Sequence, residues 1–356
     1  MSFLVACEPK PIKIGVSVTL TGLSSRIGVT GRNGIELAAE EINASGGIKS
    51  RKIELLVRDD KDLPEGALAA DEELVAEGVV AIIGHMSSRS GIKAIPFCNS
   101  KAVVVVSPTI SSTDWSGLDD FFFRPIGPNN LQGKTLAVKA LSRGLKKAAV
   151  VYESTNSAYT LNVAQSFSEA FTAGGGVAAE PIPFATSKDY RYDLLAKSIA
   201  AGDWDMILSA AGPYDNARIS QELAKLRSSL PVYAGMWSMT DDLIRNGGKT
   251  VERMTIAGTM DIHDKLPVFV DFRSAYAKRY GEDPTFASMF GYESIILLAT
   301  ALKDAKKLDS EGIKSAILAR DSFPGLQGRI ELDRFGDCTR PYRAFTVRET
   351  SFVLDE

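Results

Sequence analysis

The stretch Val79-Val80-Ala81-Ile82-Ile83-Gly84-His85-Met86-Ser87-Ser88-Arg89-Ser90 runs from a strongly apolar segment straight into a loop rich in hydroxyl groups. The pattern recurs at Val103-Val104-Val105-Val106, which is followed by Ser107-Pro108-Thr109-Ile110-Ser111-Ser112. Short apolar runs of this kind indicate buried strands. In an open parallel sheet, ligands bind beyond the carboxyl ends of the strands. Neither loop carries a metal cluster, a phosphate loop or a nucleophile with its base, so we expect a receptor for a small anionic group such as a carboxylate, not a catalyst.

Strand-like and helix-like segments alternate along the first third of the chain. We expect strands at residues 12–19, 52–58, 79–84 and 103–107, and helices at residues 33–43, 65–77 and 89–100. Within the first of these helices, apolar residues such as Ile35, Leu37 and Ile42 recur at helical spacing and mark a buried face. Strands that alternate with such helices predict βαβ units, and therefore a parallel sheet with helices on both faces.

The same alternation starts again after Gly127-Pro128. We expect strands at residues 147–152, 177–183, 206–210 and 232–236, helices at 131–145, 161–173, 190–200, 216–226, 268–280 and 286–302, and final strands near 329–332 and 343–347. A chain of 356 residues suits two domains of about 150 residues each. The periodicity alone therefore predicts two α/β domains that divide near residue 127.

Composition and charge exclude several classes of protein. A hydrophobic content of 45% and a charged content of 24% are typical of a soluble globular protein. The net charge is −3 and the basic residues are scattered, so we expect no binding to nucleic acid and no general attraction to an anionic membrane. No uninterrupted apolar run reaches the roughly 18 residues that would span a bilayer.

The three cysteines are not spaced as metal ligands, and with two histidines in the chain we expect no metal and no cofactor. Cys98 and Cys338 either pair or stay free, and we favour two buried thiols. Cys7 closes Leu4-Val5-Ala6-Cys7, which resembles the lipobox where a bacterial lipoprotein is lipidated. Residues 1–3 are too short for a signal peptide, so either an export signal has been trimmed or the match is accidental; we favour the trimmed signal.

Several segments, in their order and spacing, match a known family. They are Ile14-Gly15-Val16 to Leu20-Thr21-Gly22, the stretch from Asn33-Gly34-Ile35-Glu36-Leu37-Ala38 to Ile48, Arg124 with Gln132-Gly133, and Tyr280 to Pro284 with Gly291-Tyr292. Together they resemble the periplasmic substrate-binding proteins of branched-chain amino-acid ABC importers, the leucine/isoleucine/valine-binding family. The likeness extends over nearly the whole chain, from about residue 12 to residue 353.

The resemblance implies a type I periplasmic-binding-protein fold, in which two Rossmann-like lobes with parallel central sheets are joined by a three-strand hinge. Lobe one would hold residues 10–126 plus 259–333, and lobe two residues 127–258 plus 334–356. The implied function is an extracytoplasmic receptor that closes on a small carboxylate-bearing ligand, such as an apolar amino acid, and delivers it to ABC permease subunits. We expect a monomer that meets the membrane only through a lipid anchor at Cys7.

In that family a serine after the third strand binds the ligand carboxylate, and this position falls on Ser88. The next loop contributes a backbone group and a hydroxyl, which map to Thr109 and Ser111. Ser87 is a further candidate because a slip of one residue would exchange it with Ser88. Neutral donors can bind a carboxylate without burying an opposing charge. Alternatively, Ser88 caps the helix that starts at Arg89, and both roles are compatible because a helix N-terminus itself binds anions.

The resemblance also places ligand contacts in lobe two. Tyr159 falls where the family supplies an aromatic ring that closes over the ligand, although a core tyrosine at a helix start would look the same. Tyr214, which follows the expected strand 206–210, resembles another family contact. We expect His85 to shape its loop without binding the ligand.

One departure concerns the ligand ammonium. Amino-acid binders of this family usually place an acidic residue after the strand that ends near residue 234, but this chain has Gly235-Met236-Trp237-Ser238 there. An ammonium buried without a partner would cost several kcal/mol. Either Asp215, Asp241 or Glu153 substitutes, or the ligand lacks an amine. In the second case Trp237 would suit a bulky apolar or aromatic acid, unless Trp237 simply belongs to the core.

Two other readings keep an α/β fold. A cytoplasmic amide or amino-acid sensor would have the same architecture, and lipidation at Cys7 would exclude it. An enzyme is disfavoured because the chain has no G-x-x-x-x-G-K-[ST] loop, no G-x-S-x-G elbow and no G-x-G-x-x-G that opens a helix after a strand. His85 and His263 also offer few bases.

Overall fold

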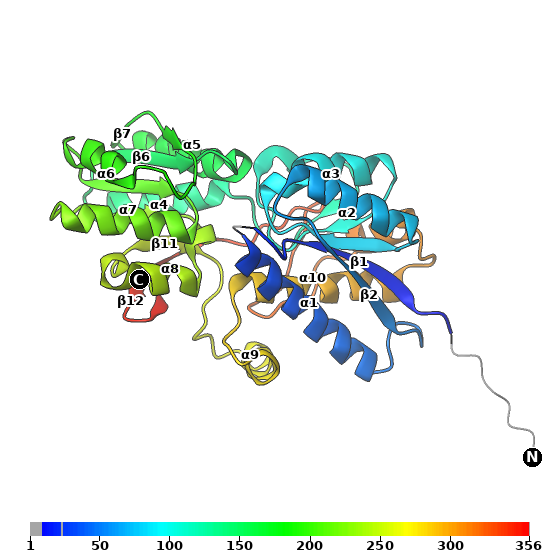
Figure 1. The fold of residues 1–356 in the computed structure, drawn as a ribbon. Helices are drawn as coiled ribbons and strands as arrows, with labels where there is room; N and C mark the ends of the chain where they lie inside the picture. The colour runs from blue at the N-terminus through cyan, green and yellow to red at the C-terminus, as the bar shows by residue number, and fades with distance from the viewer. Residues whose placement is uncertain (1–8, 23, 356) are drawn as a thin grey trace, which may run out of the picture. The chain divides into compact units, whose positions relative to one another are not determined.

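A computed structural model describes residues 9–22 and 24–355, and Cys7 lies outside them. The chain forms two compact units (Figure 1). Unit one contains the chain up to Ile110 with Gly117–Ile126 and Leu266–Cys338, and unit two contains Ser111–Ser116, Gly127–Lys265 and Thr339–Glu356. Both later boundaries fall further along the chain than residues 258 and 333, where we expected them. His263 stays with unit two, where its Nε2 lies 3.1 Å from Ser351 Oγ, and a buried ion pair with Arg124 keeps Asp337 in unit one.

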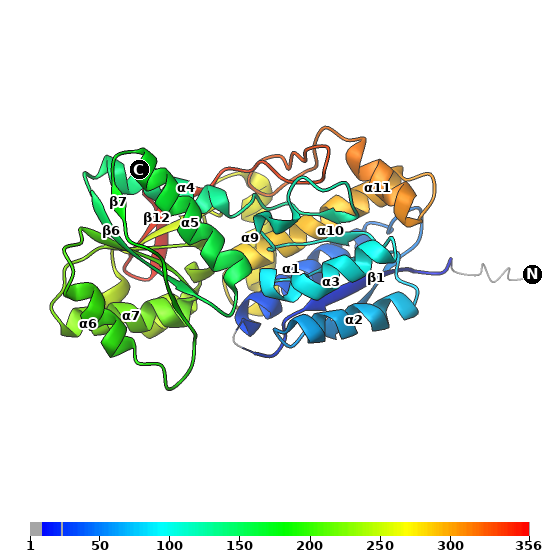
Figure 2. The same cartoon turned by 90° about the horizontal axis from the view of Figure 1, so that it is seen from above.

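Unit one has a five-stranded parallel sheet in the order β2-β1-β3-β4-β5. Its strands are β1 (Ile12–Val18), β2 (Ile53–Asp59), β3 (Ala81–Gly84), β4 (Val105–Val106) and β5 (Phe122–Phe123). Its helices are α1 (Ser25–Ala44), α2 (Pro64–Ala76), α3 (Ser88–Ser100), α9 (Pro267–Tyr280), α10 (Phe286–Asp304) and α11 (Ser310–Leu318). Helices α1 and α10 pack together on one face of this sheet, while α2 and α3 cover the other face (Figures 1 and 2).

Glycines let α1 and α10 pack at close range. A Cβ atom on Gly34 would lie 2.0 Å from the carbonyl oxygen of Ser288. Helix α1 begins at Ser25, eight residues before the expected start at residue 33. The prediction starts too late because glycine and polar residues in the first turns hide the helical apolar pattern. Helix α10 is long and apolar enough to cross a membrane by composition, but 78% of its most apolar window is buried in the protein, as in a core helix.

Unit two has an eight-stranded sheet in which β13-β12-β11-β10-β9-β6-β7 are neighbours and β8 also pairs with β6. Its strands are β6 (Lys147–Glu153), β7 (Val177–Ala178), β8 (Ile182–Phe184), β9 (Met206–Ala210), β10 (Val232–Ala234), β11 (Thr255–Gly258), β12 (Arg343–Arg348) and β13 (Ser351–Leu354). The pairs β11–β12 and β12–β13 are antiparallel and the others are parallel. Its helices are α4 (Asn130–Ser142), α5 (Ser157–Ala173), α6 (Tyr192–Ala200), α7 (Pro213–Lys225) and α8 (Asp241–Gly247), with short 3-10 helices η2 (Met236–Ser238) and η3 (Gly248–Val251). The mostly parallel α/β architecture predicted from the sequence is confirmed.

Two expected strands differ in the structure. The run 177–183 forms two short strands, β7 and β8, because Pro181 stands between them and has no N–H to donate to a ladder. Within the described part of the chain, residues 329–332 make only isolated bridges, between Phe323 and Ile330 and between Leu332 and Cys338.

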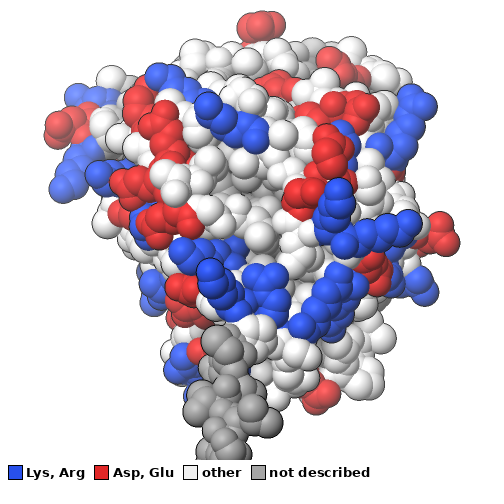
Figure 3. Space-filling view, turned by 90° about the vertical axis from the view of Figure 1, so that its right-hand side faces the viewer, with Lys and Arg blue, Asp and Glu red and all other residues white. Residues whose placement is uncertain are grey.

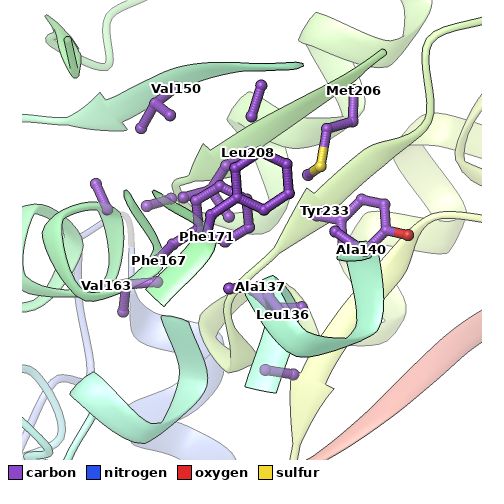
Figure 4. Packing of buried hydrophobic residues seen from close by; sticks show 14 of the residues in the cluster. Leu136, Ala137, Ala140, Val150, Val163, Phe167, Phe171, Met206, Leu208 and Tyr233 are labelled. Carbon is purple, nitrogen blue, oxygen red and sulfur yellow. The ribbon is translucent and has the colours of Figure 1, made fainter. Parts of the chain in front are cut away.

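The core of unit two lies between its sheet and the helices α4 and α5 (Figure 4). Phe167 and Phe171 stack with ring centroids 5.1 Å apart, and they pack with strand residues such as Leu208 and Tyr233. Each large apolar side chain of this kind contributes about 1.5–3 kcal/mol when fully buried. This packing holds the carboxyl ends of β6, β9 and β10 at one edge of the sheet.

Two of the three cysteines lie in the described part of the chain. Cys98 and Cys338 are both buried thiols, and they form no disulfide with each other. Burial raises the pKa of the Cys98 thiol, with the neighbouring Asp71 acting in the same direction.

On the face shown in Figure 3, Lys and Arg side chains lie beside Asp and Glu side chains over the described surface, and such neighbours weaken each other's long-range field.

Candidate functional site

The loop after β3 meets the first part of the second hydroxyl-rich loop, up to Ile110, in unit one. They follow the neighbouring parallel strands β3 and β4, and two hydrogen bonds join them. Ser107 Oγ donates to the carbonyl oxygen of His85 at 2.9 Å, and Thr109 Oγ1 donates to the carbonyl oxygen of Met86 at 2.6 Å. The two loops therefore form one surface at the carboxyl edge of the sheet.

Ser87 and Ser88 have different roles, and the alternative that Ser88 caps the helix is wrong. Helix α3 begins at Ser88, so Ser87 is its N-cap and accepts a hydrogen bond from Ser90 N at 3.1 Å. Ser88 is 2% exposed, and its Oγ has no hydrogen-bond partner among residues 9–22 and 24–355. Buried polar atoms are nearly always hydrogen-bonded, so an unpartnered hydroxyl in the first turn of a helix is available to an anionic ligand.

Thr109 and Ser111 divide in a similar way. The Thr109 hydroxyl donates its hydrogen to Met86 O, so the Thr109 backbone N–H is the group left to donate to a ligand carboxylate. Ser111 is buried, and its Oγ lacks a hydrogen-bond partner in the described part of the chain. Ser111 belongs to the short segment that groups with unit two, where its carbonyl oxygen accepts a 2.7 Å hydrogen bond from Asn129 N.

Tyr159 and Trp237 come together in unit two. Tyr159 is buried near the start of α5, and its hydroxyl donates to Gln132 Oε1 at 2.7 Å and accepts from Trp237 N at 3.2 Å. The two rings meet edge to face with centroids 6.1 Å apart. Burial raises the pKa of Tyr159, so this phenol stays protonated and acts as a donor. Tyr159 therefore positions the loop after β10.

Gln132 is a polar residue at this edge that sequence reasoning treated only as part of the crossover between lobes. It is fully buried on α4, and its Oε1 also accepts from Met236 N at 2.9 Å. Its Nε2 has no partner within the residues that the structure describes. An isolated glutamine on a helix gives no signal in the sequence, because its partners come from η2 and α5.

The loop after β10 is held without a carboxylate. Trp237 is half-buried and its ring lies against Gly212, where an added Cβ atom would come within 3.2 Å of the ring. Ser238 Oγ donates to the carbonyl oxygen of Ala211 at 2.9 Å and accepts from Asn216 Nδ2 at 2.6 Å. Trp237 thus forms an apolar wall between the loops that follow β9 and β10.

Two of the three candidate partners for a ligand ammonium are used by the protein itself. Glu153 is fully buried and accepts backbone hydrogen bonds from Thr155 N at 2.8 Å and Asn156 N at 3.0 Å, which shape the loop after β6. Asp241 is about half exposed and pairs with Arg245 one turn along α8. Neither arrangement presents a carboxylate that needs a partner.

Asp215 is different because it is buried beside aromatic rings and hydroxyls. Its carboxylate accepts from Tyr192 OH at 2.5 Å and from Thr186 Oγ1 at 2.9 Å. Burial raises the pKa of Asp215 to about 6. The adjacent Tyr214 is 41% exposed and meets Tyr192 edge to face. The structure therefore brings Tyr214 and Asp215 together at the start of α7.

Among the described residues, no group of three or more His, Cys, Asp or Glu side chains could hold a metal ion. Two cavities in unit two, of about 340 and 660 Å³, are lined by residues of α4, β12 and their neighbours, and none of the candidate ligand residues lines them.

Comparisons with known proteins agree with this architecture. A family model described as a periplasmic binding protein matches residues 11–351. The Leu/Ile/Val-binding protein homolog 3 of Brucella melitensis is 30% identical over 334 residues, which cover 93% of this chain and 89% of that protein. The leucine-binding protein LivK of Thermotoga maritima has a similar structure, with a TM-score of 0.90, 25% identity and coverage of 97% of this chain and 98% of that one.

A more distant structural neighbour is a solute-binding protein of an ABC transporter from R. palustris in complex with benzoate, with a TM-score of 0.87. It is 18% identical and covers 97% of this chain and 95% of that one, so the likeness shows the fold alone. The family predicted from the sequence is confirmed by the matched model and by the relatives. The chain therefore belongs to the periplasmic binding protein family, and it is a substrate-binding protein of an ABC transporter with the type I fold, not an enzyme.

Proposed function

We propose that this receptor captures a branched-chain or other apolar amino acid outside the cytoplasmic membrane and delivers it to ABC permease subunits. The observation that carries the proposal is the buried, unpartnered hydroxyl of Ser88 in the first turn of α3. A charge-assisted hydrogen bond from this hydroxyl would bind a carboxylate, and the N-terminus of the helix adds favourable partial charge. Relatives named for leucine, isoleucine and valine binding support the apolar amino acid.

The apolar part of the ligand would contact the aromatic residues of unit two. We assign this role to Trp237 and Tyr214, which are both partly exposed at the carboxyl edge of the second sheet. Tyr159 would act through Trp237, because its hydroxyl holds the backbone of the η2 loop. Because the ligand would contact both units, its binding would shift the population of receptor molecules toward a closed form.

Asp215 is the carboxylate that we assign to the ligand ammonium. Burial raises the pKa of Asp215 to about 6, and a cation at this position would favour the ionised form. Glu153 and Asp241 are poorer candidates because backbone N–H groups and Arg245 already satisfy them.

A second candidate is an amine-free aromatic or aliphatic acid. The absence of an acidic residue from Gly235-Met236-Trp237-Ser238 favours it, since an apolar wall replaces a charged one. In both cases we propose a monomeric receptor. A lipid anchor at Cys7 stays a prediction, because Cys7 lies outside the described residues.

The test is a thermal-shift screen followed by calorimetry. Leucine, isoleucine, valine and phenylalanine would be compared with 4-methylpentanoate, 3-phenylpropanoate and benzoate, which lack the amine. A ligand at 100 times its Kd stabilises the folded protein by about 2.7 kcal/mol, so a binder raises the melting temperature clearly. A response to the amino acids supports the first proposal, a response to the amine-free acids alone supports the second, and no response to either group contradicts both.

A further inference from the structure

A cluster of buried polar side chains lies directly behind the loop that presents Ser88. We call it the His85 cluster, and its members are Ser17, Asp60, Asp71, His85 and Cys98, all 0% exposed. They come from β1, the loop after β2, α2, the loop after β3, and α3. The proposed ligand contacts do not include this cluster, although the loop after β3 and α3 also carry Ser87 and Ser88.

His85 lies at the centre of the cluster. Its Nε2 is 3.1 Å from Asp71 Oδ2, and its Nδ1 is 3.1 Å from Ser17 Oγ. Asp60 Oδ2 lies 3.9 Å from Nδ1, and Cys98 Sγ is 3.1 Å from the same Asp71 oxygen. The imidazole therefore contacts β1 through Nδ1 and α2 through Nε2.

The backbone of His85 is fixed as firmly as its ring. Its carbonyl oxygen accepts the 2.9 Å hydrogen bond from Ser107 Oγ that joins the two hydroxyl loops. The preceding Gly84 approaches β1 so closely that an added Cβ atom would lie 2.3 Å from the carbonyl oxygen of Ser17. Two residues separate His85 from Ser88, so a rotation at His85 would move the Ser88 hydroxyl.

The charges of the cluster favour the same geometry. Burial by itself lowers the pKa of His85, but the carboxylates of Asp71 and Asp60 outweigh it and raise the pKa above its usual value. A protonated imidazole donates from both nitrogens, to Ser17 and to Asp71, and compensates part of the buried negative charge. The groups that contact His85 are the two carboxylates and the Ser17 hydroxyl, and the Cys98 thiol contacts the Asp71 carboxylate.

We propose that His85 is a positioning residue for ligand binding: it is locked between Ser17 and Asp71, and it fixes the backbone from which Ser88 presents its hydroxyl. The inference rests on the proposed function of Ser88, but the fixed loop can be measured without any ligand. It requires that loss of the imidazole loosen the loop and weaken binding beyond what loss of stability explains.

The experiment compares His85→Leu with His85→Gln and with the matched control Leu74→Ala. Leucine is close in size to the imidazole but forms no hydrogen bond, whereas glutamine can still donate to Asp71. Leu74 is fully buried on α2, one turn after Asp71, so its truncation destabilises the same helix but leaves the cluster intact. Hydrogen–deuterium exchange of residues 84–91 is measured without ligand, and calorimetry with leucine gives the Kd.

We expect His85→Leu to raise the exchange rate of the loop amides about tenfold or more, and to raise the Kd for leucine by a similar factor. Each change corresponds to the loss of one charge-assisted hydrogen bond. His85→Gln should recover part of both effects, and Leu74→Ala should lower the melting temperature but leave both within about twofold, as expected of a site outside the loop. Equal loop exchange in His85→Leu and the unmodified protein would overturn the inference.

The inference can still be tested if His85→Leu does not fold or if no tested acid binds. If His85→Leu does not fold, Ser17→Ala removes only the hydroxyl beside Nδ1, and unchanged loop exchange in that variant would count against the inference. If the unmodified protein binds none of the tested acids, the proposed function fails, while the exchange data still decide whether His85 fixes the loop.

Discussion

Arg124 and Asp337 form a buried ion pair at the place where the chain leaves unit one. Arg124 Nη2 lies 2.6 Å from Asp337 Oδ1, and Nε donates to the same oxygen at 2.8 Å. Arg124 stands two residues before the passage into unit two at Ile126, and Asp337 one residue before the passage at Cys338. A single pair thus anchors two of the connecting segments to unit one.

Replacing one member of this pair should be costly. Arg124→Met leaves the Asp337 carboxylate buried without its cation, and we expect a loss of about 3–5 kcal/mol in the free energy of unfolding. The double variant with Asp337→Leu should recover part of that loss. Recovery is incomplete because Asp337 Oδ2 also accepts a 2.8 Å hydrogen bond from Gly117 N. Urea denaturation measures all three, and a double variant no more stable than Arg124→Met would contradict a paired role.

Ser87 and Ser88 should separate stability from binding. Ser87→Ala removes the N-cap of α3 and should cost about 0.5–2 kcal/mol of stability. Ser88→Ala removes a hydroxyl without a partner in the described chain, so its melting temperature should barely change. Its leucine affinity should fall by about 1.5–3 kcal/mol, the contribution of a hydrogen bond to a charged group. Unchanged affinity in Ser88→Ala would remove this residue from the ligand site.

Stability should depend on pH through His85. Its folded pKa is raised by Asp71 and Asp60 against the effect of burial, so protonated His85 stabilises the fold. This contribution is fully present below the unfolded pKa of about 6.5 and is lost as pH rises through the folded value. The melting temperature of the unmodified protein should therefore fall, relative to His85→Gln, as pH rises above about 6.5. Parallel pH profiles for the two proteins would show that His85 is not charged in the fold.

Leucine affinity should depend on pH through Asp215. Burial raises the pKa of this carboxyl to about 6, so protonation below that pH removes the proposed partner of the ammonium. We expect leucine binding to weaken below pH 6, and Asp215→Asn to bind leucine about tenfold or more weakly at pH 7.5, with no such pH dependence.

The control for Asp215 is 4-methylpentanoate, which has the side chain and carboxylate of leucine but no amine. It should bind Asp215→Asn at least as well as the unmodified protein, because no ammonium is involved. If Asp215→Asn binds leucine normally, the amine is bound elsewhere or the natural ligand has none.

Much of the architecture could be predicted from the sequence because it depends on short-range patterns. Apolar runs such as Val103 to Val106 indicate buried strands, and the helical spacing around Ile35 indicates a helix with one buried face. Their alternation along the chain predicts an α/β fold. The start of α1 at Ser25 was missed, since glycine and polar residues there form helix only when packed against other elements.

The same local signal predicts the place of the candidate site, but it does not predict the contacts that its residues make. Hydroxyl-rich loops after two buried strands, and a stretch without an acidic residue at 235–238, could be read from the amino-acid order alone. Two findings needed the folded chain: Ser87 caps α3 while Ser88 stays without a partner in the described chain, and Asp215 is buried beside Tyr192. The physical reason is distance along the chain: His85 bonds a serine 68 residues away, and Arg124 an aspartate 213 residues away, and such partners leave no periodic pattern to read.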